Sequence, residues 1–150
     1  MKNRKIHIVL LLAACICFVS FQGQKDVIST KYKAYFGCVY TDNVVVDANT
    51  FKQLMALPLC AKDSANISYK VKSFDLTYAE RGLYQDDEGK PIIFTDYTSD
   101  SFTGDTINTY WKKSFNERLY KGDTVFFDRI ICSVSSNRNI ICKALKVIIK

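Results

Sequence analysis

The stretch between residues 66 and 81 constrains the fold more than any other part of the sequence. Apolar residues occupy every second position in two runs that are out of phase, namely Ile67, Tyr69 and Val71, then Phe74, Leu76 and Tyr78. A period of two is typical of a β-strand with one buried face. The change of phase between Val71 and Phe74 predicts a β-bulge or a crossing of the strand between sheets. A strand of this length needs several neighbours, so we expect a predominantly β fold.

Other segments fit the same fold class. β-Branched and aromatic residues predict further strands at residues 34–40, 43–46, 91–95, 124–134 and 140–149. Two short helices are expected, at 47–55 with a capping box that begins at Thr50, and at 106–119 with Asp105 or Thr106 as N-cap. Residues 85–90 predict a turn. No repeat or linker interrupts this pattern, so residues 25–150 are predicted to form one mostly β domain.

The N-terminal segment, residues 1–24, reads as a targeting sequence. Three of its first five residues are basic, and residues 6–22 form an apolar run. Three interpretations remain open: a signal peptide cleaved near Gln22–Gln24, a lipoprotein signal with Cys15 as the lipidated residue, and an uncleaved anchor. All three export the domain to the periplasm or the outer membrane. Membrane contact is then expected only through this segment, if it is uncleaved or lipidated.

Export changes what the cysteines imply. Four of them follow the N-terminal segment, without CxxC spacing: Cys38, Cys60, Cys132 and Cys142. An oxidising compartment favours disulfides between them. Cys132 and Cys142 are equidistant from Asn137 in a turn-rich pentapeptide, so a hairpin centred there would place them opposite each other. That pairing leaves Cys38 to pair with Cys60. The alternative is four free buried thiols.

Histidine and net charge exclude several classes of function. The single histidine, His7, lies in the N-terminal segment, so the exported domain has no imidazole for Ser-His-Asp catalysis or for zinc binding. Without residues 1–24, 18 basic residues face 15 acidic ones, and a net charge of +3 gives little support for nucleic-acid binding. We therefore expect no catalytic activity, no cofactor and no metal site. The acidic run Asp86-Asp87-Glu88 is interpreted as a solvated turn because it lacks the spacing of a calcium-binding loop.

Four aromatic residues are candidates for ligand contact. They lie in the region 82–111, namely Tyr84, Tyr97, Tyr110 and Trp111. Exposed aromatic rings stack on sugars and peptide side chains, so an alternative function is a periplasmic or surface module that binds carbohydrate or peptide. Against this, Tyr110 and Trp111 share helical spacing with Ile107 and Phe115, which favours a core stripe.

An ordered set of motifs resembles the C-terminal domain family of the gliding-motility protein GldM, over roughly residues 44–150. The family pattern x-V-x-S-F-x-L-x-Y followed by K/R-G matches Lys70–Gly82, its K-x-G-D-x-V-x-F-x-x-I motif resembles Lys121–Ile130, and its final strand resembles Ala144–Lys150. The resemblance implies an immunoglobulin-like β-sandwich for residues 25–150. It also implies a docking module of the type IX secretion and gliding machinery, whose partner is an envelope protein or a second copy.

Overall fold

The computed structural model describes residues 28–135 and 138–150 and is mostly β over these residues. The strands are β1 (Ile28–Phe36), β2 (Tyr40–Thr41), β3 (Asn43–Val46), β4 (Cys60–Lys62), β5 (Ser68–Gln85), β6 (Pro91–Thr103), β7 (Thr124–Ser135), β8 (Arg138–Lys143) and β9 (Leu145–Ile149). The described helices are α2 (Ala48–Leu54) and α3 (Thr109–Arg118). The prediction of a mostly β domain with one or two short helices is confirmed. The predicted targeting segment, Cys15 included, lies outside the described residues.

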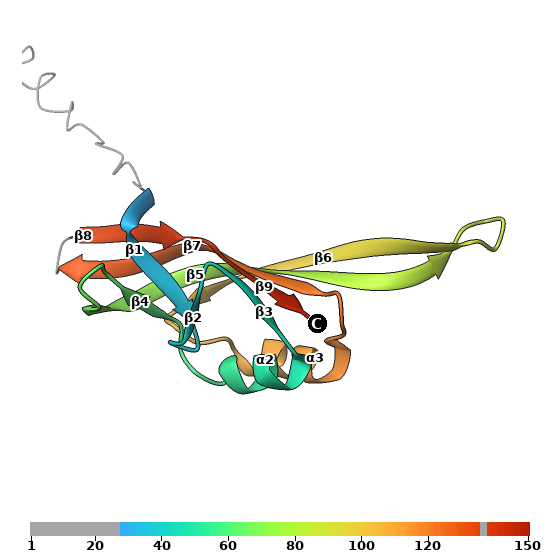
Figure 1. Cartoon of the computed structure of the whole chain (residues 1–150), viewed down its shortest axis with the longest axis horizontal. Helices are drawn as coiled ribbons and strands as arrows, with labels where there is room; N and C mark the ends of the chain where they lie inside the picture. The colour runs from blue at the N-terminus through green and yellow to red at the C-terminus, as the bar shows by residue number, and fades with distance from the viewer. Residues whose placement is uncertain (1–27, 136–137) are drawn as a thin grey trace, which may run out of the picture.

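Part of the sheet closes on itself to form a barrel-like ring (Figure 1). β1, β4, β5, β7 and β8 pair in that order through antiparallel ladders, and β8 returns to pair with β1 in parallel. In five strands that alternate in direction, the first and the last point the same way, so the ring closes only through a parallel pair. The predicted immunoglobulin-like sandwich is not confirmed, because all the described strands belong to one sheet of nine strands.

The change of phase in the longest predicted strand corresponds to irregular pairing between β5 and β7. Val71 faces Cys132 and Ser73 faces Ile131, so β5 carries one extra residue at this point. Val71, Phe74, Leu76 and Tyr78 are all buried. The bulge keeps Val71 and the second apolar run on the inner face of the sheet, as the sequence predicts. Ile67 lies before β5 and is 55% exposed, so the first run is only partly buried.

The pairing between β7 and β8 differs from its prediction by two residues at Cys132. Cys132 faces Ile140, and Ile131 faces Ile141, so Cys142 is not opposite Cys132. Both thiols are free and buried, and the predicted Cys132–Cys142 disulfide is wrong in this structure. The strand expected at residues 140–149 is also divided after Lys143, because β8 and β9 pair with different halves of β7. Asn137, the expected centre of the turn, lies outside the described residues.

The second predicted disulfide is present. Cys38 and Cys60 are bonded, with their Cα atoms 5.0 Å apart. The bond links the turn after β1 to the start of β4, next to the ladder in which Tyr35 faces Cys60. It therefore reinforces an antiparallel pair of the ring.

The two helices cover the half of the sheet that extends beyond the ring, and aromatic rings join them to it (Figure 1). Phe51 of α2 packs on Phe36 and on Phe115 of α3, with ring centroids 5.1 Å and 5.2 Å apart. Phe115 packs in turn on Tyr78 of β5. The N-caps are Asp47 and Asn108, whose side chains accept backbone amides three residues on. The predicted caps at Thr50, Asp105 and Thr106 are wrong. α2 agrees with the helix predicted at 47–55 to within one residue but is capped by Asp47, and α3 begins three residues later than predicted.

A two-stranded ribbon projects from the body of the molecule (Figure 1). The pairing of β5 with β7 ends at Ala79, whereas its pairing with β6 continues to Gln85 opposite Pro91. The ribbon turns at residues 86–90, where the turn was predicted. We call residues 79–97 the arm. β6 extends to Thr103, eight residues beyond the predicted end at Thr95.

Candidate functional site

The arm exposes large apolar side chains on both of its faces. These residues are Leu83, Tyr84, Ile92, Ile93, Phe94 and Tyr97. Leu83 and Ile93 face each other on one side, with 75% and 64% of their surfaces exposed. Tyr84 lies opposite Ile92 on the other side and packs edge-on against Phe94, with centroids 5.6 Å apart. Contiguous exposed apolar surface of this kind marks an interaction site.

The hydrogen bonds at the two ends of the β5–β6 ladder establish which backbone groups of β6 point outward. The amide of Asp86 donates to the carbonyl of Lys90 at 3.0 Å, and the amide of Gly104 donates to the carbonyl of Lys72 at 2.6 Å. The register between these bonds is unbroken. Because successive residues of an antiparallel strand point their N–H and C=O groups to alternate sides, even-numbered residues of β6 face β5 and odd-numbered residues face away.

β6 lies at the edge of the sheet, so these outward groups have no neighbouring strand among the described residues. One of them is covered by a side chain: the amide of Ser101 donates to the carboxylate of Asp100 at 2.8 Å. Asp100 also accepts the indole N–H of Trp111. The open part of the edge therefore runs from Ile93 to Ser99.

The opposite edge of the arm is shorter. Beyond Ala79 the outward residues of β5 are Arg81, Leu83 and Gln85, by the same alternation. The amide of Arg81 donates to the carboxylate of Asp123 at 2.8 Å, which closes the edge at its root. Asp123 itself is fully buried. β6 thus offers the longer open edge, and it is the candidate interaction surface.

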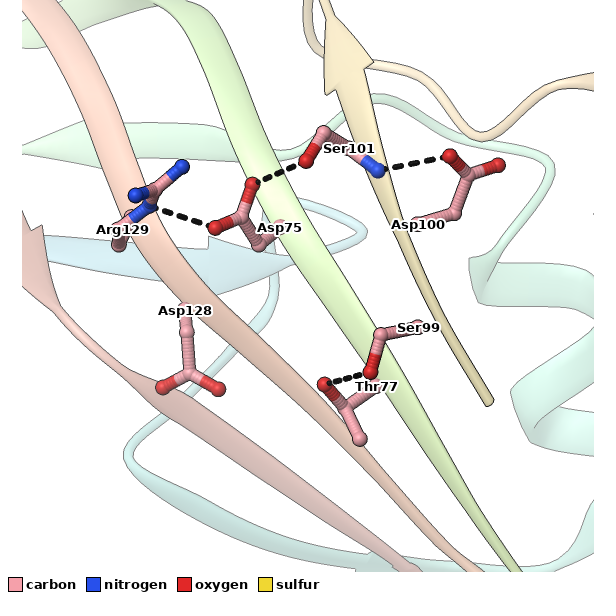
Figure 2. Close-up of a pocket in the computed structure, with 7 residues that line it drawn as sticks. All are labelled: Asp75, Thr77, Ser99, Asp100, Ser101, Asp128 and Arg129. Atoms are coloured by element: carbon pink, nitrogen blue, oxygen red, sulfur yellow. Dashed lines mark hydrogen bonds and ion pairs between the residues drawn. The ribbon is translucent and has the colours of Figure 1, made fainter. Parts of the chain in front are cut away.

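A polar hollow of about 420 Å³ lies at the base of the ribbon, on the face that also carries Leu83 and Ile93 (Figure 2). Nε of Arg129 pairs with Asp75 at 2.6 Å, and Ser101 donates to the same carboxylate at 2.8 Å. Partial burial, with a smaller contribution from Asp75, raises the pKa of Asp128. The described residues contain no cluster of three or more potential metal ligands.

The structure does not bring the four predicted aromatic residues into one site. Tyr84 and Tyr97 lie on opposite faces of the arm, and Tyr110 is exposed on α3. Trp111 is only 3% exposed and packs on Phe115, so its assignment as a ligand contact is wrong. The core stripe favoured by its helical spacing accounts for its position.

The acidic turn at the tip of the arm has a structural role. The Asp86 side chain accepts the amides of Glu88 and Lys90, which holds the turn closed. Sequence analysis missed the covering role of both acids. Asp100 stands in no motif and covers an amide in an unpredicted part of β6, whereas Asp123 stands in the motif at Lys121–Ile130 but accepts the Arg81 amide, which is distant in sequence.

Within residues 28–135 and 138–150, no helix has the length and apolar character needed to cross a membrane. Comparison of the chain with models of known protein families, with curated proteins and with solved structures finds no match.

Proposed function

We propose that the chain is an exported, non-catalytic protein-interaction module of the bacterial cell envelope, and that it binds through the open edge of β6. The resemblance to the docking domain of the GldM family is consistent with this role. The Cys38–Cys60 disulfide is compatible with an exported protein. Outside the N-terminal segment the sequence has no histidine for acid–base chemistry.

The observation that carries this proposal is the arm. Its edge presents unpaired backbone groups from Ile93 to Ser99, and apolar side chains flank that edge on both faces. An added strand gains backbone hydrogen bonds from such an edge and specificity from the alternating side chains. Soluble proteins usually blunt a long edge with charges, bulges or prolines. Of these protective features, β6 has only Pro91 and the acids Asp96 and Asp100, and the outward backbone groups between Ile93 and Ser99 are left without a partner strand among the described residues.

Ile93→Pro tests the proposal directly. Proline at this position removes an N–H that points away from β5, so the β5–β6 ladder is retained while the outer edge loses its first donor. Tyr110→Ser is the matched control, since it removes an exposed aromatic side chain from α3. The full chain and the two variants are each used to capture protein from envelope extracts of cells that export the chain, and the bound proteins are identified by mass spectrometry.

We expect a defined set of bound proteins with the wild-type chain and with Tyr110→Ser, and its loss with Ile93→Pro. Capture of nothing above background by the wild-type chain would contradict the proposal. Equal capture by wild type and Ile93→Pro would also contradict it. Loss with Tyr110→Ser alone would favour the alternative of a carbohydrate- or peptide-binding module.

A further inference from the structure

We infer that the partner of the arm is a second copy of this chain, paired antiparallel along β6 about a two-fold axis at Ile93; this rests on the proposed function and names its partner. In a two-fold interface the same strand lies on both sides, so its sequence must complement itself when reversed. The outer edge of β6 meets that condition in its backbone, its apolar side chains and its charges.

The backbone condition restricts where the axis lies. Odd-numbered residues of β6 point outward, so each must pair with an odd-numbered residue of the second copy, which places the axis at a residue position and not between two. An axis at Phe94 would set Ile92 against Asp96 and Lys90 against Thr98, so we place the axis at Ile93. At Ile93, each copy donates its Ile93 amide to the Ile93 carbonyl of the other, and each Thr95 amide reaches the carbonyl of Pro91 in the second copy. Pro91 has no N–H, but its carbonyl is the group that this pairing uses.

The apolar side chains are also matched in this register. On the side of the sheet that carries Tyr84, Ile92 of one copy lies opposite Phe94 of the other. On the other side, the two Ile93 side chains lie opposite each other. All of these side chains are exposed in the single chain. The two arms together form a four-stranded sheet whose central ladder pairs exposed apolar groups on both faces, which is the kind of cross-strand contact that stabilises sheets.

The charges favour the same register. Lys90 is the single basic residue from position 82 to position 110, and reversal about Ile93 places it opposite Asp96 of the second copy. Symmetry provides this ion pair twice. A two-fold axis at Thr95 would instead set Phe94 against Asp96, and Lys90 against Asp100, whose carboxylate is already occupied by Ser101 and Trp111. The axis at Ile93 is therefore the better fit.

Within the part of one chain that the structure describes, these charged groups have a weak ion pair or none. Lys90 pairs with Glu88 at 2.7 Å, but more than 70% of both side chains is exposed, and such a pair contributes little. Asp96 lies opposite Glu80 in the ladder, and Glu80 already pairs with Arg118, which leaves Asp96 without an ion pair among the described residues. In the dimer, Lys90 of the second copy lies opposite Asp96, whereas within one chain Lys90 pairs with Glu88.

The experiment measures the mass of the full chain by sedimentation velocity, in wild type and in three charge variants. Asp96→Lys and Lys90→Asp each place like charges opposite each other twice, so we expect each to weaken dimerisation roughly tenfold. The combined variant Lys90→Asp with Asp96→Lys restores opposite charges in both pairs and is expected to dimerise like the wild type. Thermal unfolding of each variant confirms that it is folded.

Ile93→Cys supplies an independent geometric test. A hydrogen-bonded antiparallel pair holds its Cα atoms about 5.5 Å apart, which a disulfide can span, so oxidation should link two copies through residue 93. Leu83→Cys is the control: it is equally exposed on the same face but lies on β5, one strand further from the axis. It should not cross-link at a comparable rate.

A wild-type chain that stays monomeric up to its solubility limit overturns the inference. So does a dimer that Asp96→Lys leaves intact, or equal cross-linking of the two cysteine variants. If the chain is monomeric and still captures another envelope protein in a manner that Ile93→Pro abolishes, the proposed function stands and only the identity of the partner fails.

Discussion

Tyr78 donates a 2.6 Å hydrogen bond to the carboxylate of Asp123, and this bond ties β5 to the turn that precedes β7. The same carboxylate accepts the amides of Arg81 and Tyr120, each at 2.8 Å. Burial and the adjacent carboxylate together raise the pKa of Tyr78 well above its usual range, so the phenol stays protonated as a donor. The root of the arm is therefore anchored by one fully buried acid that receives three hydrogen bonds.

We predict that Asp123→Asn destabilises the domain by about 2–4 kcal/mol. The asparagine side chain has one N–H₂ group, which must point either at the Arg81 amide or at the donors of Tyr78 and Tyr120. In either orientation two donors face each other. Tyr78→Phe is the control, because it removes only the hydroxyl, which donates to Asp123 and lies 3.1 Å from the carbonyl of Arg118, and should cost about 1 kcal/mol. Urea unfolding measures both values. If the two variants lose equal stability, the carboxylate does not have the central role assigned to it.

The Cys38–Cys60 disulfide should contribute strongly to stability. It closes a loop with a sequence separation of 22 residues, for which restriction of the unfolded chain predicts about 3 kcal/mol. We expect the double variant Cys38→Ser with Cys60→Ser to lose about that much free energy of unfolding. Reductant should lower the melting temperature of the wild-type chain and leave that of the double variant unchanged. A wild-type melting temperature that is insensitive to reductant would argue against this bond.

Cys132 and Cys142 should behave as unreactive thiols. Both side chains are buried, with 0% of Cys132 and 2% of Cys142 exposed, and their sulfurs interact within the core. That interaction raises the pKa of Cys132 and lowers that of Cys142, so burial is the reason we expect alkylating reagents to label neither residue in the folded protein. After unfolding without reductant, we expect both of these residues to be free thiols, as mapped by mass spectrometry. Fewer than two would mean that the pair oxidises.

We predict that ionisation of the Asp128 carboxyl group makes the free energy of unfolding depend on pH. Its pKa is raised in the folded state, so the folded protein binds this proton more tightly than the unfolded chain does. Ionisation therefore weakens folding as the pH rises from the usual carboxyl pKa through the raised value. Asp128→Asn should be more stable than wild type at neutral pH, by about 0.5 kcal/mol, and equal to it in acid.

Thermal unfolding across that pH range provides the measurement for Asp128→Asn. Asp87→Asn, which removes one negative charge from the exposed turn at the tip of the arm, controls for the change in net charge. A gain in stability of equal size for both variants would assign the effect to net charge, and the local burial of Asp128 would then not be its cause.

The sequence pattern predicted those features of the fold that depend on residues close together in the chain. The alternation around Val71 and Phe74 predicted both the strand and its irregularity, because a buried face imposes its period directly on the residues. The turn at 86–90 followed from Asp86 and Gly89, which suit a tight turn. The part of β6 beyond Thr95 was missed, because residues 96–103 are exposed apart from Phe102 and no burial pattern therefore marks them as a strand.

Features that depend on distant pairing were not predictable from single segments. Closure of the ring joins β1 to β8, more than a hundred residues away in the sequence, and no local pattern specifies that contact. The predicted Cys132–Cys142 bond failed for a related reason. Cys132 faces Ile140, two residues short of Cys142, and the ladder contains an irregularity between Ser133 and Ser135 that a symmetric turn at Asn137 does not predict.

The parallel closure of the ring determines when the domain is able to fold. Lys33 pairs with Lys143, so a chain that is still being synthesised or threaded through a translocation pore lacks the last partner of its first strand. Contacts of such sequence separation form slowly, because the intervening chain must be ordered first. Until the end of β8 emerges, the buried faces of β1 and β5 have no complete enclosure and remain accessible to chaperones. Folding of this domain is thus a late event, completed only when nearly the whole chain is free.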